Sequence, residues 1–183
     1  MKPFTPDPSS TFETFLHNQK NAFPVHTAKK LVLNPFQQTN PFVISGAQGS
    51  GKSHLLKAIA ELFHRNQIRD IVLLTPDEIL SHVQRANTNG QALQDKLNSF
   101  EVLMIDDFHR LAQHPQLQET LLPCFEQRIQ NQKQIILTCC GKLAEQSMLQ
   151  AMLSRVQAGI LVDIQQPDLD VRIEFLKKQN EQN

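Results

Sequence analysis

The chain has 183 residues, a length typical of one domain with a sizeable core. Its 18 basic and 18 acidic residues balance, which excludes a global electrostatic attraction to nucleic acid or to an anionic membrane and leaves only local contacts. No apolar stretch approaches the ~20 residues that a membrane helix needs, and the N-terminus lacks the apolar core of a signal peptide, so we expect a cytoplasmic protein with no membrane partner.

Strand-like runs alternate with helical patterns along most of the chain. The runs that favour strands are residues 42–45, 70–75, 102–105, 134–138 and 159–164. Such alternation is typical of an α/β fold in which helices cover both faces of a parallel sheet. We therefore predict a five-stranded, three-layer core over residues 11–176, a flexible N-terminal tail at residues 1–10 and a polar tail at 177–183.

A glycine-rich loop follows the first predicted strand and matches the phosphate-loop pattern G-x-x-x-x-G-K-[ST]. Its residues are Gly46, Ala47, Gln48, Gly49, Ser50, Gly51, Lys52 and Ser53. Apolar residues at helical spacing come next, so the loop is a strand-to-helix turn. Its backbone N–H groups and the helix dipole would bind phosphates, Lys52 would reach the β- and γ-phosphate oxygens, and the Ser53 hydroxyl would complete a magnesium shell. The pattern predicts a nucleoside triphosphate ligand, with a chance glycine-rich turn as the alternative.

Two later helices carry local signals of their own. Thr75 and Glu78 have the spacing of a capping box, with Pro76 at the first helical position. Residues 87–90 are predicted to form a turn between two short helices. The apolar face over residues 117–129 contains Pro123, which predicts a kink or a helix that restarts there.

Two acids end the third predicted strand, the apolar run 102–105. Ligands bind outside the carboxyl ends of the strands in open α/β sheets, so Asp106 would lie near a magnesium ion held by Ser53. Asp107 would polarise the attacking water as a general base. The alternative is that both acids only cap the next helix.

The three cysteines are Cys124, Cys139 and Cys140. Their number is odd and their spacing is not that of a metal site, so we interpret them as small buried or half-buried side chains. The seven histidines do not imply a zinc site either.

The order of these segments resembles the replication-initiator branch of the AAA+ ATPases, the DnaA and Hda family of P-loop NTPases. Residues 11–15 (Thr-Phe-Glu-Thr-Phe) are similar to the opening motif of that family, and residues 46–56, 102–107 and 134–138 are similar to its phosphate loop, acidic strand and sensor strand. Ser154-Arg155, Gly159 and residues 163–169 match a later segment. Several motifs in the same order make a chance resemblance improbable.

The resemblance implies roles for further residues. Phe15 and Asn21 would lie beside the adenine, His54 would belong to the nucleotide-binding loop, and ATP or ADP with Mg would be the ligand. Arg155 falls on the arginine finger, which reaches the γ-phosphate of a neighbouring subunit's nucleotide and neutralises transition-state charge. The alternative for Arg155 is an ordinary salt-bridged arginine.

The chain also departs from the family pattern. The sensor strand ends in Cys139 and Cys140, where the family carries Ser-Asp, so a polar residue that senses the γ-phosphate is missing. The segment 76–97 occupies the place of the insert that lines the single-stranded DNA channel, and its basic residues are Arg85 and Lys96, with His82 beside them, which weakens the expectation of single-stranded DNA binding. Residues 114–116 carry no basic residue where DnaA uses one on single-stranded DNA. We also expect a short form without the helical lid, the DNA-binding domain or a clamp-binding peptide, and hence weak nucleotide affinity and slow turnover.

The function implied is that of a regulator of chromosomal replication initiation that acts on another AAA+ subunit, either the initiator or a second copy of the chain. Weak ATP hydrolysis is an open expectation. The alternatives are a DnaC-type helicase loader and a stand-alone P-loop ATPase or kinase. A kinase would need an arginine-rich lid, whereas only Lys142 and Arg155 follow Thr138 before the final helix.

Overall fold

Five parallel strands form the centre of the molecule. The structure is a computed structural model, and it describes residues 1–36, 40–86, 90–145, 147–171, 173 and 177. The sheet has the order β2-β3-β4-β1-β5, and each neighbouring pair is parallel. The strands are β1 (Phe42–Gly46), β2 (Ile71–Leu74), β3 (Val102–Ile105), β4 (Gln134–Cys140) and β5 (Ile160–Ile164). The predicted α/β fold with a five-stranded parallel sheet is confirmed.

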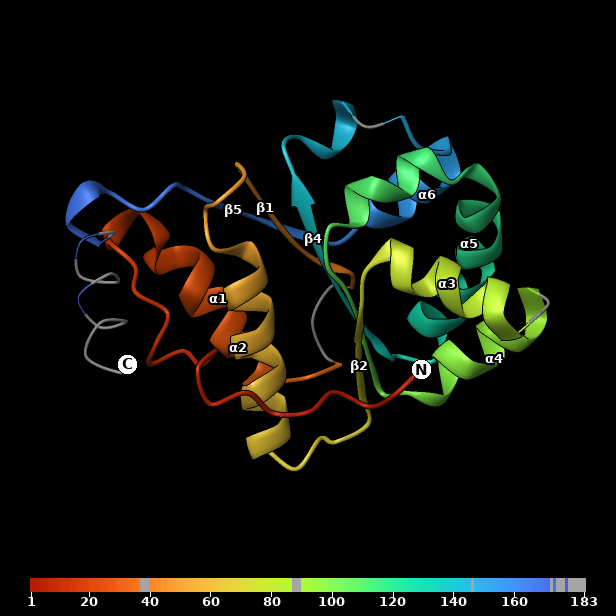
Figure 1. The fold of residues 1–183 in the computed structure, drawn as a ribbon, viewed down its shortest axis with the longest axis horizontal. Helices are drawn as coiled ribbons and strands as arrows, with labels where there is room; N and C mark the ends of the chain where they lie inside the picture. The colour runs from red at the N-terminus through yellow and green to blue at the C-terminus, as the bar shows by residue number, and fades with distance from the viewer. Residues whose placement is uncertain (37–39, 87–89, 146, 172, 174–176, 178–183) are drawn as a thin grey trace.

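Helices cover both faces of this sheet, so the fold has three layers (Figure 1). One face carries α1 (Ala22–Leu33) and α2 (Lys52–Arg65). The other face carries α3 (Pro76–Ala86), α4 (Gly90–Ser99), α5 (Pro115–Gln130) and α6 (Gln150–Gln157). Short 3-10 helices are η1 (Gln19–Asn21), η2 (Phe108–Gln113) and η3 (Leu143–Glu145).

The sheet has a hydrophobic core on each face, and successive side chains along a strand point alternately into one core and the other. In β1, Val43 packs with the helices α3 to α6, whereas Phe42 and Ile44 pack with α1 and α2. All three side chains are fully buried. Strands buried on both faces are apolar at every position, which explains the continuous apolar runs in the sequence.

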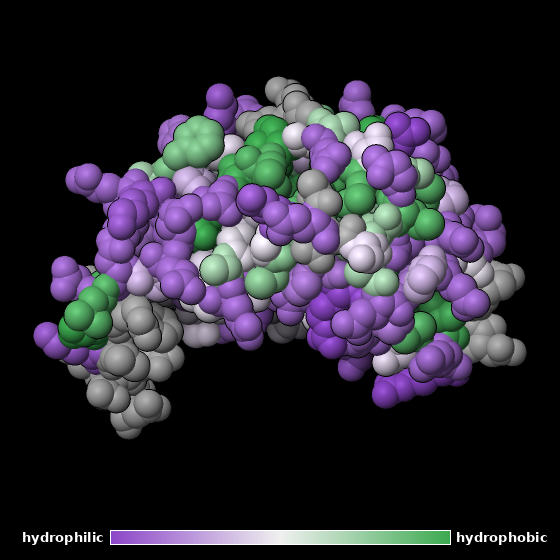
Figure 2. Space-filling model, turned by 90° about the horizontal axis from the view of Figure 1, so that it is seen from above, coloured by the Kyte–Doolittle hydropathy of each residue, from purple (hydrophilic) through white to green (hydrophobic). Residues whose placement is uncertain are grey.

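The surface seen from the carboxyl edge of the sheet is mostly hydrophilic, with separate hydrophobic patches (Figure 2). Large exposed apolar side chains occur in three segments, namely α1 (Phe23 and Leu33), β5 (Leu161) and the residues after β5 (Leu169 and Ile173). None of the helices in the described part of the chain combines the length and the apolar character that a membrane crossing requires.

Residues 1–10, expected as a tail outside the core, make several contacts with it in the structure. The Phe4 N–H donates to the Ile71 carbonyl of β2 at 2.7 Å, and its ring packs beside the core of α1 and α2. Ser10 is buried, and Met1 packs against the opposite core. Two apolar residues among prolines, Met1 and Phe4, give no periodic signal, so the sequence did not reveal these contacts. Figure 1 shows the N-terminal segment passing beside β2.

Helix α5 is a single helix that continues through Pro123, so the alternative of a restarting helix is wrong. Pro123 is exposed, and the carbonyl that loses its intrahelical partner can bind water there. Cys124 and Cys139 are buried and Cys140 is half-buried, as predicted. The predicted turn at residues 87–90 and the polar tail fall largely outside the described residues.

The predicted capping box at the start of α3 is present. Glu78 Oε2 accepts hydrogen bonds from the Thr75 N–H (2.7 Å) and hydroxyl (3.1 Å), and the Glu78 N–H donates to Thr75 Oγ1 (3.3 Å). We expect Glu78→Ala to lower the free energy of unfolding by ~0.5–1 kcal/mol, because one cap partner is lost. Urea denaturation measures this, and Glu119→Ala, at an exposed position in the second turn of α5, is the control. Equal losses in both variants would contradict the cap.

Candidate nucleotide-binding site

The phosphate loop joins β1 to the N-terminus of α2, as predicted, and its backbone conformation requires glycine. Gly51 lies at φ 97° directly before Lys52, the first residue of the helix. A Cβ there would also lie 3.0 Å from Phe15 Cε2. At Gly46 a Cβ would lie 2.4 Å from the Ile164 carbonyl oxygen. The loop is therefore packed too closely for side chains at these positions.

Lys52 and Ser50 show that the loop fits a phosphate group. The Lys52 side chain is buried, and its Nζ donates to the carbonyls of Gly46 (3.0 Å) and Ala47 (2.8 Å). Ser50 Oγ is buried without a hydrogen-bond partner among the described residues. An ammonium held by carbonyls, an unpartnered hydroxyl and a helix N-terminus are the features of an anion site.

A cavity of about 470 Å³ brings the phosphate loop together with the acidic edge of β3. Asp107 lines it together with Lys52 and Ser53, so the predicted general base shares the cavity with the predicted phosphate ligands. Asp106 is half-buried at the end of β3 and is not among the lining residues. The lining residues are Gln48, Gly49, Gly51, Lys52, Ser53, His54, Asp107, His109 and Cys140.

Thr138 of β4 holds the two acids in place, a role that the sequence did not reveal. Its hydroxyl donates to Asp106 Oδ1 and accepts the Asp107 N–H at 2.8 Å. Asp107 has a left-handed backbone (φ 52°, ψ 42°), which Asp tolerates better than most residues. Thr138 is fully buried. It reaches the two acids because β4 lies next to β3, and the strand order that makes them neighbours is seen only in the structure.

A second cavity of about 390 Å³ lies beside the loop, where the adenine was expected. The Phe15 ring stands edge-on to the His54 ring, with centroids 5.4 Å apart. His54 also contacts Thr14 Oγ1 at 3.1 Å, and burial lowers the pKa of His54, which favours a neutral ring. The cavity is lined by Thr14, Phe15, Leu16, Asn21, Gly49, Ser50, Gly51, His54, Pro167 and Val171.

Asn21 lines this cavity, but its amide is already used within the chain. Its Nδ2 donates to the Gln165 carbonyl (3.0 Å), and its Oδ1 accepts the Gln165 N–H (2.9 Å). The side chain is almost fully buried. Asn21 therefore fixes the segment after β5 against the cavity, with one hydrogen bond at each end of its amide engaged by the Gln165 backbone.

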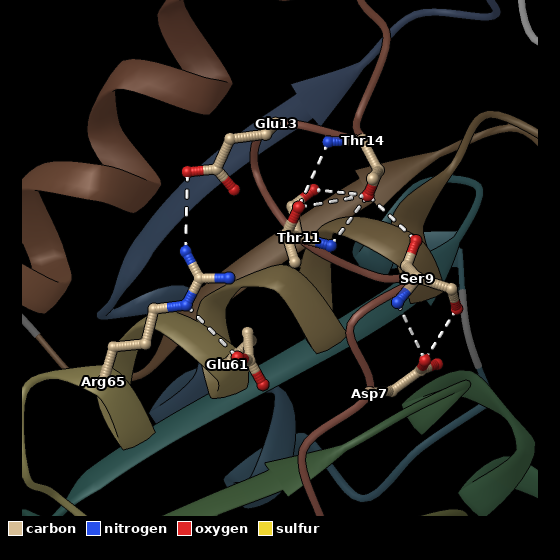
Figure 3. Close-up of polar contacts among 7 residues, drawn as sticks. All are labelled: Asp7, Ser9, Thr11, Glu13, Thr14, Glu61 and Arg65. Atoms are coloured by element: carbon tan, nitrogen blue, oxygen red, sulfur yellow. Dashed lines mark hydrogen bonds and ion pairs between the residues drawn. The ribbon is translucent and has the colours of Figure 1, made fainter. Parts of the chain in front are cut away.

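The segment before the cavity is attached to α2 (Figure 3). Thr11 and Thr14 exchange hydrogen bonds, with the Thr11 N–H donating to Thr14 Oγ1 at 2.8 Å and the Thr14 N–H donating to Thr11 Oγ1 at 3.2 Å. Arg65 of α2 pairs with Glu13 (3.6 Å) and with Glu61 (3.2 Å). These contacts hold Phe15 in position at the wall of the cavity.

Arg155 lies on α6, outside the residues that line the phosphate cavity. Its side chain is 52% exposed, and both Nε (3.0 Å) and Nη2 (2.9 Å) donate to Glu126 Oε1 of α5. An exposed pair of this kind contributes at most ~1 kcal/mol to stability. Arg155 is therefore held loosely on the surface and does not reach the phosphate loop of its own chain.

The residues present fit a magnesium nucleotide. Mg²⁺ is commonly bound by one or two protein oxygens together with substrate phosphates. Ser53, at the start of α2, and Asp106, directly after β3, carry such oxygens. Among the described residues, no group of three or more His, Cys, Asp or Glu is placed to hold a metal by itself.

Three-layer architecture, strand order and phosphate loop together define a P-loop NTPase fold of the AAA+ type. The family model "Bacterial DnaA ATPase domain" matches residues 7–163, and the chain belongs to this family. The predicted resemblance to the replication-initiator branch is confirmed.

Known proteins of this family align with the whole chain. The chromosomal replication initiator protein DnaA of Nautilia profundicola is 32% identical over 192 residues, which cover 100% of this chain and 43% of that protein. Domain III of Thermotoga maritima DnaA has a TM-score of 0.87 at 25% identity and covers 97% of this chain and 76% of that structure. AMPPCP-bound DnaA from Aquifex aeolicus has a TM-score of 0.84 at 24% identity, covering 97% and 56%, and shows the shared fold. The chain thus spans about two fifths of the length of the curated relative.

Proposed function

We propose that this chain binds ATP or ADP with Mg and uses its nucleotide state and Arg155 to regulate replication initiation through another AAA+ subunit. The observation that best supports this function is the geometry of the phosphate loop before α2. There the buried Ser50 hydroxyl has no hydrogen-bond partner among the described residues, and Lys52 is held by two loop carbonyls. The DnaA family membership and the AMPPCP in the Aquifex aeolicus structure support the choice of ligand. Family membership also favours this function over a helicase loader or a kinase.

Each residue would act through its position. Lys52 would leave the carbonyls of Gly46 and Ala47 and turn to the phosphate oxygens. Ser53 and Asp106 would hold Mg²⁺, which supplies positive charge to the phosphates when bound. Asp107 would accept a proton from the attacking water in the shared cavity. Phe15 and His54 would contact the base.

The proposed function also requires a neighbouring subunit that receives Arg155. The Arg155 guanidinium is half exposed and lies outside the cavity of its own chain, so another AAA+ subunit, either the initiator or a second copy, would receive it. Single-stranded DNA is a weaker candidate partner. Arg85 and Lys96 lie on α3 and α4, and Lys96 is placed over the Phe100 ring at 5.5 Å.

ATP hydrolysis in trans tests this function. We expect the chain alone to turn over below about one ATP per second. Mixing it with purified DnaA initiator should raise hydrolysis, and Arg155→Ala should remove about tenfold or more of that stimulation, because arginine fingers contribute large rate factors. Arg69→Ala is the control, since Arg69 is an exposed arginine between α2 and β2 and is not among the residues that line the phosphate cavity.

If Arg155→Ala keeps the full stimulation, Arg155 does not act on the neighbour's nucleotide and serves only in its surface ion pair with Glu126. Hydrolysis by the chain without the initiator is also measured at increasing chain concentration. A rate per molecule that rises with concentration would identify a second copy, and not the initiator, as the neighbour.

A further inference from the structure

The end of β4 forms one wall of the phosphate cavity and carries only weak polar groups. Cys140 lines the cavity, and Cys139, beside it, points into the core of α3 to α6. Burial raises the pKa of Cys139 to about 11, so that thiol stays neutral. Thiols are weak hydrogen-bond donors, and β4 therefore offers little to a terminal phosphate.

His109 of η2 occupies the same wall. Its Nδ1 accepts the Cys140 N–H at 3.2 Å. A ring nitrogen that accepts a backbone N–H must be unprotonated, which places the proton of the neutral ring on Nε2. The half-buried ring lines the cavity with Lys52 and Ser53.

The surroundings favour this neutral form. Burial is the largest cause that lowers the pKa of His109, and the positive charges of Lys52 and Arg110 act in the same direction. Asp107 and Asp106 oppose them. The ring is therefore a neutral donor at neutral pH, oriented by β4.

From the hydrogen bond to β4 and the position in the cavity wall, we propose that His109 recognises the γ-phosphate through Nε2–H and makes the site prefer ATP over ADP. This inference rests on the proposed nucleotide binding. His109 takes the part of a sensing residue that the cysteines at the end of β4 cannot supply. The donor comes from η2, directly after the acidic pair, so the same short helix would position both the general base Asp107 and the sensing group.

A structural role is the competing explanation, in which His109 only accepts the Cys140 N–H. His109→Asn separates the two roles. The asparagine Oδ1 can occupy the place of Nδ1 and keep the bond to Cys140, whereas nothing replaces the distal Nε2–H. His26→Asn, on the exposed face of α1, is the matched control.

Calorimetric titration of the native chain and both variants with Mg-ATP and Mg-ADP tests the proposal. We expect His109→Asn to bind ATP about tenfold or more weakly, the effect of one hydrogen bond to a charged group, with ADP affinity unchanged within about twofold. His26→Asn should match the native chain for both nucleotides. Thermal unfolding without nucleotide checks that the variants are folded.

Parallel loss of ATP and ADP affinity in His109→Asn would overturn the proposal and leave the structural role. An unchanged preference for ATP would overturn it as well, while nucleotide binding by the native chain would keep the proposed function intact. A native chain that binds neither nucleotide would overturn the proposed function, and the sensing role with it.

Discussion

Replacing Lys52 with alanine is expected to weaken ATP and ADP binding by roughly 30-fold or more. Lys52 lies at the start of α2 and would contribute charge-assisted hydrogen bonds to the phosphates. Hydrogen bonds to charged groups are worth ~1.5–3 kcal/mol, and ~1.4 kcal/mol corresponds to a factor of ten in affinity. Isothermal titration calorimetry with Mg-nucleotide gives both dissociation constants directly.

Lys57 provides the matched control for this experiment. It lies on the same helix with an exposed side chain, so Lys57→Ala removes an equal charge away from the loop. Lys52 also donates to two loop carbonyls without nucleotide, so the unfolding temperature of Lys52→Ala must be measured alongside. Equal affinities in native chain and Lys52→Ala, with both folded, would show that the loop is only a scaffold.

Replacing Arg128 with methionine is expected to lower the free energy of unfolding by ~3–5 kcal/mol. Arg128 of α5 is completely buried, and its guanidinium donates at 2.8–3.0 Å to four backbone carbonyls, those of Leu97, Phe100, Glu101 and Gln134. Burial lowers its pKa to about 10, which still leaves it charged at neutral pH. Each buried carbonyl that loses its donor costs ~1–3 kcal/mol, and water can satisfy only some of them.

Urea denaturation measures the loss at Arg128, with Arg110→Met as the same substitution at an exposed, paired arginine. We expect Arg110→Met to change stability by less than ~1 kcal/mol. Arg128→Lys keeps the charge but cannot reach four carbonyls at once, so it should lie between the two. A loss in Arg128→Met no larger than that of Arg110→Met would refute the role of these hydrogen bonds.

The sequence predicted those features that depend on local pattern. All five strands were expected within two residues of their observed bounds, because buried parallel strands are continuous apolar runs. The phosphate loop, the acids after β3 and the capping box at Thr75 each follow from a spacing of a few residues. Such patterns act within one turn or one strand, so they require no knowledge of the strand order.

The features that sequence reasoning missed depend on contacts between distant segments. Thr138 of β4 bonds to Asp106 at the end of the neighbouring strand β3, and His109 meets Cys140 only because η2 packs beside the end of β4. Arg128 follows Leu121 and Phe125 on the buried face of α5. That position in the sequence could have indicated a structural role, because a charge within an apolar helical stripe must find buried partners. Asn21 was predicted beside the base, and its use by Gln165 could be seen only in the fold.

The left-handed backbone at Asp107 limits which substitutions give interpretable kinetics. Most side chains lose about 1–2 kcal/mol in that conformation, whereas asparagine and aspartate adopt it comparatively easily. Alanine would therefore change both the charge and the course of the chain into η2, where His109 lies. Asparagine removes the charge and keeps the turn, so a rate measured with Asp107→Asn reports on the carboxylate alone.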